Sequence, residues 1–255
     1  MPTSKWEALN RRIVHEGLRW HEVQEELLDI LAELDHLRRE DRIPEGRYRQ
    51  KGNYFRDTII ALIKARCGVE VREMEVPGRT DMHRVDFSYL RDGEGSQRGF
   101  VLLAGEAKAM GSPEHERSGK HYPERSLSID IDKRIKEVKY TPIDLKRRVD
   151  PQVTKKWPDF IMETPPAFFT AWLMRLAARD HLDHIFNKLK GVVEYTNGVG
   201  VALYSEREDG NYEWIAEVPK PLLTVEALIE RICHYLSRQE ERPCVGNRNI
   251  YNRRS

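Results

Sequence analysis

The sequence predicts an α/β fold in which a central mixed sheet is flanked by helices and preceded by a helical N-terminal extension. The first observation is a 3-4 spacing of apolar residues over 5–42, which indicates a long helix or a helical pair. The second is a series of apolar or alternating segments that end near Gly, Pro or Asp, as strands do. The third is that longer helical patterns separate these segments. The predicted strands are 69–76, the segment around Asp86, 100–109, 198–205 and 212–218, and the predicted helices are 53–66, 129–140, 166–190 and 224–237.

The composition is that of a globular chain outside the membrane. Of the 255 residues 33% are charged, and the formal net charge is +1. No run of about 18 apolar residues is present, so no membrane partner is expected. The N-terminus also lacks the apolar segment of a signal peptide. The three cysteines, Cys67, Cys233 and Cys244, are odd in number and widely spaced, which predicts reduced thiols and a cytoplasmic location.

Two parts are predicted along the chain, a helical extension at 1–46 and an α/β domain at 47–255. The apolar residues of the extension form a heptad-like seam. This seam either packs on the core of its own chain or forms the interface of a homodimer, and the spacing fits both. The seam residues are Trp6, Leu9, Ile13, Trp20, Val23, Leu27, Ile30, Leu34 and Leu37.

The first elements of the α/β domain are a helix and two strands. The helix 53–66 should stop at Gly68. The alternation of strand 69–76 changes phase near Arg72 and Glu73, which predicts a bulge. In the next strand, alternation predicts one face with Val85, Phe87 and Tyr89 and an opposite face with Arg84, Asp86 and Ser88.

The later elements follow the same rules. Strand 100–109 is apolar on both faces as far as Glu106, which predicts a central position in the sheet. Helix 129–140 should be limited by Pro142. Helix 166–190 has Pro166 at its first turn and Gly191 at its expected end.

The most informative residues are Asp86 and the triplet Glu106-Ala107-Lys108. Glu106 and Lys108 are two apart, so they share one face of a strand. If the loop between the two strands is centred near Ser96, residue i faces residue 192 − i, and Asp86 lies opposite Glu106. Paired carboxylates about 5 Å apart repel each other unless a cation or proton lies between them. Mg²⁺ prefers such ligands, and Lys108 can position a water or stabilise charge on a phosphate.

This pattern resembles the PD-(D/E)XK nuclease superfamily, which includes the type II restriction endonucleases. Asp86, Glu106 and Lys108 match its Asp…Glu-x-Lys order, although Val85 stands where the family name has Pro. The resemblance implies a restriction-endonuclease-like fold and Mg²⁺-dependent hydrolysis of double-stranded DNA. It also implies that Asp86, Glu106 and the carbonyl of Ala107 hold the metal.

The resemblance further implies an acid on the helix before the Asp86 strand. The residue after Phe55, commonly Glu in relatives, is Arg56, so this role passes to Asp57. The expected protein is a homodimeric type II restriction endonuclease. The alternatives are a DNA repair or junction-resolving nuclease of the same superfamily, or a non-catalytic DNA-binding protein.

A basic insertion at about 111–160 is the predicted DNA-binding region. Residues 117–156 hold twelve Lys or Arg and six Asp or Glu, and Lys and Arg bind phosphates through counterion release. A solvated charged face is the other interpretation. The predicted DNA contacts are Lys133, Arg134, Lys136, Lys139, Lys146, Arg147 and Arg148.

Three other motifs are weaker candidates for a site. Glu137-Val-Lys139 and Asp144-Leu-Lys146 repeat the acid-x-Lys spacing, but they lack a preceding apolar strand and fit DNA contact better. Asp180-His181-Leu-Asp183-His184 has metal-binding residue types, but it falls on a predicted core helix without a third ligand nearby.

Overall fold

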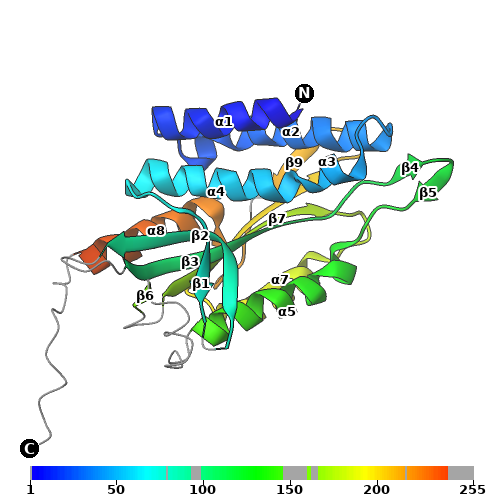
Figure 1. Ribbon diagram of the computed structural model, residues 1–255. Coiled ribbons are helices and arrows are strands. Elements are labelled where there is room, and N and C mark those ends of the chain that lie inside the picture. The colour runs from blue at the N-terminus through cyan, green and yellow to red at the C-terminus, as the bar shows by residue number, and fades with distance from the viewer. Residues whose placement is uncertain are drawn as a thin grey trace, which may run out of the picture.

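The computed structural model describes residues 2–78, 80–92, 99–145, 160–161, 166–215 and 217–240. A sheet lies between two helical layers, one formed by α1, α2, α3, α4 and α8 and the other by α5 and α7 (Figure 1). The predicted α/β fold with a central mixed sheet flanked by helices is therefore confirmed. The helices are α1 Pro2–Glu16, α2 Trp20–Arg39, α3 Glu45–Arg49, α4 Lys51–Cys67, α5 Leu127–Leu145, α7 Leu182–Val193 and α8 Val225–Glu240.

The described sheet has eight strands, with β1-β2-β3-β7-β8-β10 as its main order. β1, β2 and β3 are antiparallel neighbours, whereas β3, β7, β8 and β10 run parallel. β6 pairs with β3, β9 pairs with β8, and β4 and β5 form a separate hairpin. The strands are β1 Arg72–Pro77, β2 Met82–Asp92, β3 Gly99–Met110, β4 His115–Arg117, β5 Lys120–Tyr122, β6 Phe160–Ile161, β7 Ala167–Leu176, β8 Gly198–Glu206, β9 Tyr212–Ile215 and β10 Leu223–Thr224.

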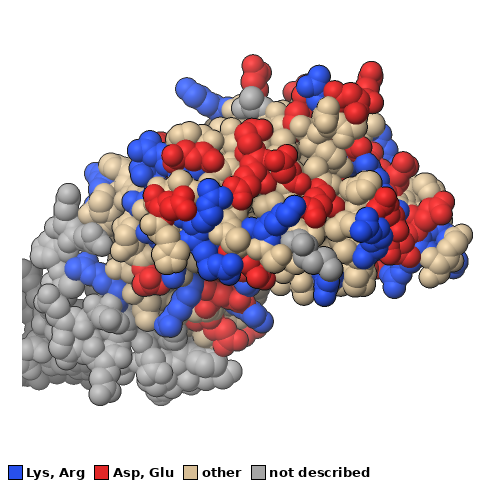
Figure 2. Space-filling model, turned by 90° about the horizontal axis from the view of Figure 1, so that it is seen from above, with Lys and Arg blue, Asp and Glu red and all other residues tan. Residues whose placement is uncertain are grey.

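The N-terminal extension is a helical pair that packs on its own chain. The seam residues of α1 and α2 belong to the same core as α4, α8 and the upper face of the sheet. Trp6 also donates a hydrogen bond to Thr58 of α4 at 2.8 Å. The outer surface of this layer mixes acidic and basic side chains (Figure 2). The packing favours the first interpretation of the seam, and dimerisation stays a prediction without a surface assigned to it.

Helix α4 forms where the sequence predicts it. Its buried side chains, which include Phe55, Ile59 and Leu62, face the sheet. Gly68 follows the last turn with φ of 67°, a left-handed conformation that favours glycine. This end of α4 leads directly into β1.

The predicted helix 166–190 is wrong over its first half. Residues Ala167–Leu176 form strand β7, and the side chains from Ala167 to Met174 are all buried. β7 lies between β3 and β8, with helices on both faces, so apolar residues occur without alternation. Such a run does not distinguish a buried strand from a buried helix by periodicity. The helical half begins only at Leu182.

The prediction of reduced cysteines is wrong for two of the three. Cys67 at the end of α4 and Cys233 in α8 form a disulfide, with Cα atoms 5.0 Å apart. The pair is separated by 166 residues in the sequence, so only the packing of α4 against α8 brings it together. Cys244 lies outside the described residues. The cytoplasmic expectation loses the support that it drew from reduced thiols. Among the described helices, none is long and apolar enough to cross a membrane.

Helix α5 is longer than the predicted helix 129–140, and the prediction that Pro142 limits it is wrong, since Pro142 lies inside the helix and Leu145 ends it. Its apolar stripe, with Ile131 and Val138, packs against α7 and the lower face of the sheet. Both ends are tied to other elements by aspartates. Asp180 accepts hydrogen bonds from the backbone at the start of α5, and Asp144 in the last turn bonds the β1–β2 turn.

Candidate functional site

Strands β2 and β3 pair in the predicted register near the candidate site. Phe87 pairs with Gly105, Ser88 with Ala104 and Tyr89 with Leu103, and each pair obeys the 192 − i relation. One residue beyond these pairs, where the ladder between β2 and β3 has ended, the same relation places Asp86 opposite Glu106. The register shifts beyond Tyr89, on the side away from the site. The two carboxylates therefore come from adjacent positions of two neighbouring strands.

A bulge in β2 sets the direction of Asp86. Arg72 pairs with Ser88 and Met74 with Val85, so Asp86 and Phe87 together face one residue of β1. The predicted irregularity is confirmed, with the extra residue on β2. The prediction that Val85 and Phe87 share one face of the strand is wrong. Val85 packs in the lower core, on the side of α5 and α7, and Phe87 packs in the upper core, on the side of α4 and α8. Bulges of this kind redirect side chains next to functional sites.

Asp86, Glu106 and Lys108 form a compact carboxylate–lysine cluster. Lys108 Nζ lies 2.6 Å from Glu106 Oε2 and 4.0 Å from Asp86 Oδ2. The backbone N–H of Ala107 donates a hydrogen bond to Asp86 Oδ2 at 2.9 Å. Glu106 is nearly buried with 8% of its side chain exposed, whereas Asp86 retains 28%. The cluster is thus held by the sheet on one side and reached by solvent through Asp86 and Lys108.

Thr141 of α5 is a fourth member of the site that the sequence patterns did not identify. Its hydroxyl donates a hydrogen bond to Glu106 Oε1 at 3.1 Å, and its side chain is buried. The Glu106 carboxylate is thus held between two partners, with Thr141 at Oε1 and Lys108 at Oε2. A signal was present, since Thr141 is a polar residue on the apolar stripe of α5 next to Val138 and Leu145.

Gly105 allows the close packing on which the cluster rests. A Cβ atom at this position would lie 2.2 Å from Phe87 Cζ and 2.5 Å from the backbone oxygen of Phe169. The second contact belongs to the backbone of β7, which is paired with β3 at this point. Only a residue without Cβ fits between the two strands and the upper core.

The cluster fits a hard divalent cation. Asp86 and Glu106 offer carboxylate oxygens, and Mg²⁺ needs few protein ligands because it keeps several waters. The ammonium of Lys108 already lies beside both carboxylates, so the site accommodates positive charge. The carbonyl of Ala107, the third predicted ligand, belongs to β3 between Glu106 and Lys108. Among the described residues, no group of three His, Cys, Asp or Glu gathers around one point.

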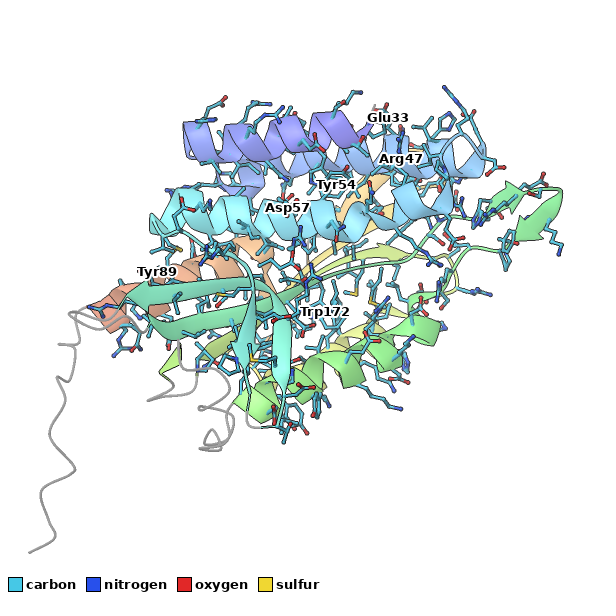
Figure 3. All side chains as sticks on the ribbon, in the orientation of Figure 1. Glu33, Arg47, Tyr54, Asp57, Tyr89 and Trp172 are labelled. Carbon is cyan, nitrogen blue, oxygen red and sulfur yellow. A yellow bond between two sulfur atoms is a disulfide. The ribbon has the colours of Figure 1, made fainter. Side chains whose placement is uncertain are left out.

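Among the described residues, Asp57 forms no hydrogen bond or ion pair with a member of the cluster. Its carboxylate accepts hydrogen bonds from Arg56, which also bonds Glu73 of β1. Asp57 lies on α4 in the upper helical layer (Figure 3). Thr141, in contrast, contacts Glu106 from α5 in the lower layer. A role for Asp57 in the site stays a prediction.

The predicted DNA contacts fall partly on α5. Lys133, Arg134 and Lys136 are exposed there, and Arg134 pairs with Glu137. Lys139 is half-buried over the ring of Tyr195. Lys146, Arg147 and Arg148 lie outside the described residues. Of the predicted DNA contacts, the exposed ones that the structure describes thus lie on the outer face of the helix whose inner face carries Thr141.

Asp144 and Asp180, from the weaker motifs, have structural partners. Asp144 is buried and accepts hydrogen bonds from His83 Nε2 at 2.8 Å and from Thr80. Asp180 accepts bonds from Ala177 N and from Ser126 and Leu127 at the start of α5. Burial alone would raise the pKa of each carboxyl, but these hydrogen bonds outweigh it and leave both pKa values lowered. They act as helix anchors in the described structure.

Replacing Asp144 by asparagine should lower the free energy of unfolding by about 1–3 kcal/mol at pH 7. A carboxyl with a lowered folded-state pKa stabilises the protein above its unfolded-state pKa, and this contribution is lost as pH falls through the folded-state pKa. The difference between wild type and variant should therefore shrink below about pH 4. Urea unfolding at several pH values measures it, with exposed Asp29→Asn on α2 as the control. An equal difference at pH 7 and pH 3 would contradict the assignment.

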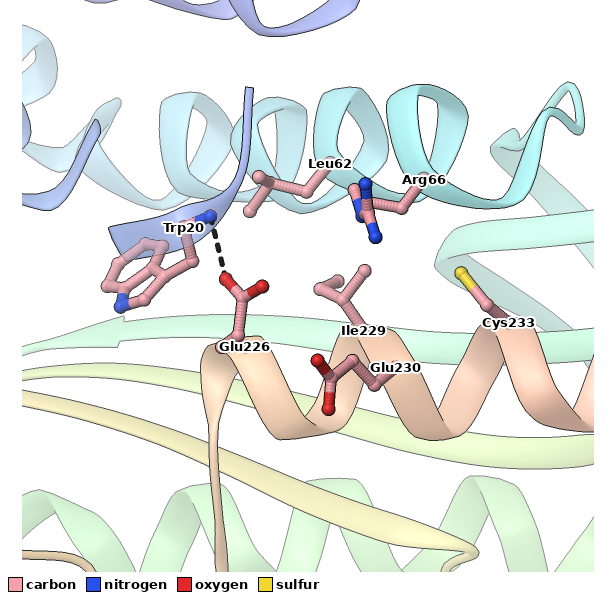
Figure 4. Close-up of a pocket in the computed structure, with 7 residues that line it drawn as sticks. All are labelled: Trp20, Leu62, Arg66, Glu226, Ile229, Glu230 and Cys233. Carbon is pink, nitrogen blue, oxygen red and sulfur yellow. Dashed lines mark hydrogen bonds between the residues drawn. The ribbon is translucent and has the colours of Figure 1, made fainter. Parts of the chain in front are cut away.

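Two of the cavities formed by the described residues differ in their position relative to the cluster. The smaller, of about 170 Å³, lies between α2, α4 and α8, away from the cluster. Its lining is shown in Figure 4, where the backbone N–H of Trp20 donates to Glu226 at 2.9 Å. The larger, of about 670 Å³, opens where β3 ends, immediately after the cluster. The second cavity is therefore the one that a ligand of the cluster can reach along β3.

The chain was compared with protein-family models, with curated proteins and with solved structures, and none of the three comparisons found a match. The interpretation of its function therefore depends on the residues and geometry of the cluster.

Proposed function

We propose that the protein is a Mg²⁺-dependent endodeoxyribonuclease of the PD-(D/E)XK superfamily that cleaves double-stranded DNA as a type II restriction enzyme. The observation that carries the proposal is that Asp86 of β2 and Glu106 of β3 both lie within 4.0 Å of the ammonium of Lys108. The mixed sheet flanked by helices agrees with the restriction-endonuclease-like fold that the motif implies. A homodimer would match a two-fold symmetric DNA site and belongs to the same proposal.

In the proposed site, each side chain has a separate task. Asp86, Glu106 and the carbonyl of Ala107 would hold Mg²⁺, which would polarise the phosphodiester and make a bound water more acidic. Lys108 would orient the attacking water and stabilise negative charge on the phosphate. The Ala107 N–H and the Thr141 hydroxyl hold the two carboxylates in place. Attack of the water oxygen on phosphorus would release the 3′ oxygen, leaving 5′-phosphate and 3′-hydroxyl ends.

The substrate would lie along α5. The exposed cations of this helix, with Lys133 and Lys136 among them, would contact phosphates and supply affinity without sequence preference. Thr141 on the buried side of the same helix donates a hydrogen bond to Glu106, which links α5 to the cluster.

Incubation of the purified protein with plasmid DNA tests the proposal. With Mg²⁺ present we expect discrete fragments, and with EDTA we expect intact plasmid. Cleavage confined to branched or mismatched DNA would instead favour a junction-resolving or repair nuclease of the same superfamily. Tight DNA binding without cleavage in Mg²⁺ or Mn²⁺ would reject the enzymatic role and leave a DNA-binding protein.

A further inference from the structure

The 670 Å³ cleft at the end of β3 is strongly cationic. Its walls come from α2, α3, the first turn of α4, the β4–β5 hairpin, the start of α5 and the turn before α7. Eight basic side chains line it against three acidic ones. The basic residues are Arg38, Arg49, Lys51, Arg117, Arg125, Lys133, Arg134 and Arg179, and the acidic residues are Glu45, Glu124 and Asp130.

The three acids of the cleft neutralise only part of this charge. Glu45 pairs with Arg49 and Arg117, and Asp130 pairs with Arg125. Glu124 pairs with Arg175 of the buried core rather than with a basic residue that lines the cleft. Four cations have no acidic partner among the described residues, and they are Arg38, Lys51, Lys133 and Arg179.

Arg38 has an unused hydrogen-bond donor. Only 3% of the residue is exposed, and its NH2 nitrogen lies 2.7 Å from His115 Nε2. The imidazole nitrogen must accept this bond, because a guanidinium cannot. The NH1 nitrogen is buried without a hydrogen-bond partner among the described residues. A buried charged donor without an acceptor is costly, and because Arg38 lines the cleft, an anion bound there would supply the missing acceptor.

Lys51 adds a second buried cation to the same wall. Its ammonium donates to the carbonyl of Gly111 at 2.8 Å and to Tyr48 at 3.0 Å, with Tyr204 farther away at 3.5 Å. Burial lowers the pKa of Lys51 to about 8, while Asp35 opposes and Arg175 adds to the decrease. An anion in the cleft would favour the charged form of this lysine.

The cleft and the carboxylate–lysine cluster lie on the same two elements. Ala109, Met110 and Gly111 line the cleft directly after Lys108, and because a strand rises about 3.3 Å per residue, Gly111 lies about 10 Å from Lys108 along the strand direction. On α5, Arg134 lies seven residues before Thr141, which is also about 10 Å along a helix. Successive phosphates of one DNA strand are about 3.4 Å apart along the duplex axis, so the offset corresponds to about three nucleotides.

We propose that this cleft binds a phosphate group of the DNA strand about three nucleotides from the bond that is cleaved, with Arg38 as its buried contact. The inference depends on the proposed nuclease function and adds a second contact point for the same substrate. Arg38 NH1 donates to a phosphate oxygen, and Lys133 and Arg179 supply charge at the mouth of the cleft. The bound group is an internal phosphodiester or a terminal phosphate, and the probes below distinguish the two.

The first test measures binding without cleavage. Fluorescence anisotropy in EDTA compares wild type with Arg38→Gln on labelled DNA duplexes that carry or lack a 5′-phosphate. We expect Arg38→Gln to weaken binding about tenfold to a hundredfold, the usual effect of losing a charge-assisted hydrogen bond. Exposed Arg42→Gln, whose partner is Glu40 and which does not line the cleft, is the matched control and should change binding less than about twofold. Equal affinities of Arg38→Gln and the control would overturn the proposal.

The second test identifies the phosphate. A neutral methylphosphonate is placed at each position of the strand in turn, and wild type should lose affinity at a position about three nucleotides from the cleavage site. In Arg38→Gln the same substitution should have no further effect, because both changes remove one contact. Additive losses at every position would reject the assignment. If wild type bound 5′-phosphorylated duplexes more tightly than unphosphorylated ones and Arg38→Gln did not, the bound group would be a terminal phosphate.

The third test separates this inference from the nuclease proposal. Inorganic phosphate should raise the melting temperature of wild type and of Arg42→Gln but not that of Arg38→Gln. This result does not require DNA cleavage, so it holds even if the cluster proves inactive. Arg38→Lys keeps the charge in case the glutamine variant does not fold, and it should bind with intermediate affinity. Identical phosphate responses in all variants would overturn the cleft as an anion site.

Discussion

Replacing Lys108 by alanine should abolish Mg²⁺-dependent DNA cleavage while leaving DNA binding close to that of wild type. Among the described residues, Lys108 is the only cation that lies within ion-pair distance of both Asp86 and Glu106. Groups that move a proton or orient a nucleophile typically contribute a factor of about 10²–10⁴ to the rate. Because Asp86 and Glu106 remain, the variant keeps the ligands proposed for the metal. A selective loss of the chemical step is therefore expected.

The measurement is the rate of plasmid cleavage under single-turnover conditions, with duplex binding in EDTA measured in parallel. Asp86→Ala should lose cleavage as well, because it removes a proposed metal ligand. Lys5→Ala is the matched control, since Lys5 is an exposed lysine of α1 paired with Glu33 in the helical layer on the other face of the sheet. Unchanged cleavage by both Lys108→Ala and Asp86→Ala would reject the nuclease assignment.

Replacing Gly105 by alanine should destabilise the protein by about 1–3 kcal/mol or more, although it adds only one methyl group. The added Cβ would overlap the ring of Phe87 and the backbone oxygen of Phe169. The ring can shift, but the oxygen belongs to β7, which is hydrogen-bonded on both sides within the sheet. Strand β3 must then move away from β7, and Glu106 moves with it. Cleavage should fall together with stability.

Urea unfolding of Gly105→Ala and Gly52→Ala measures this effect against a matched control. Gly52 lies in α4, where a Cβ would meet nothing within 4 Å. There alanine favours the helix, so stability should stay the same or rise by up to about 1 kcal/mol. If both variants were equally stable, the close contact between β3 and β7 would be wrong.

The sequence predicted the elements whose patterns are local. The register predicted for β2 and β3 holds from Phe87 to Tyr89, whereas the pairs nearer the loop are shifted by one residue. The central position of β3 followed from its apolar residues on both faces. The predicted register is therefore right next to the cluster and wrong next to the loop, because the register shifts between Tyr89 and Leu90.

The features that the sequence did not predict depend on packing between distant segments. β7 was assigned to a helix because a strand covered on both faces has no alternation. Thr141 was missed because its contact with Glu106 requires α5 to cross beneath β3. The unused donor of Arg38 becomes visible only when α2 and the β4–β5 hairpin are placed side by side.

The disulfide between Cys67 and Cys233 also determines how the chain would respond to tension. Every described strand, together with α5 and α7, lies between these two cysteines in the sequence. A pulling force applied at the two ends of the chain would pass from α4 to α8 through the sulfur atoms and would bypass the sheet. Helices α1 to α4 and the part of α8 after Cys233 would bear the load, while the strands that carry Asp86, Glu106 and Lys108 would remain unloaded inside a closed covalent ring.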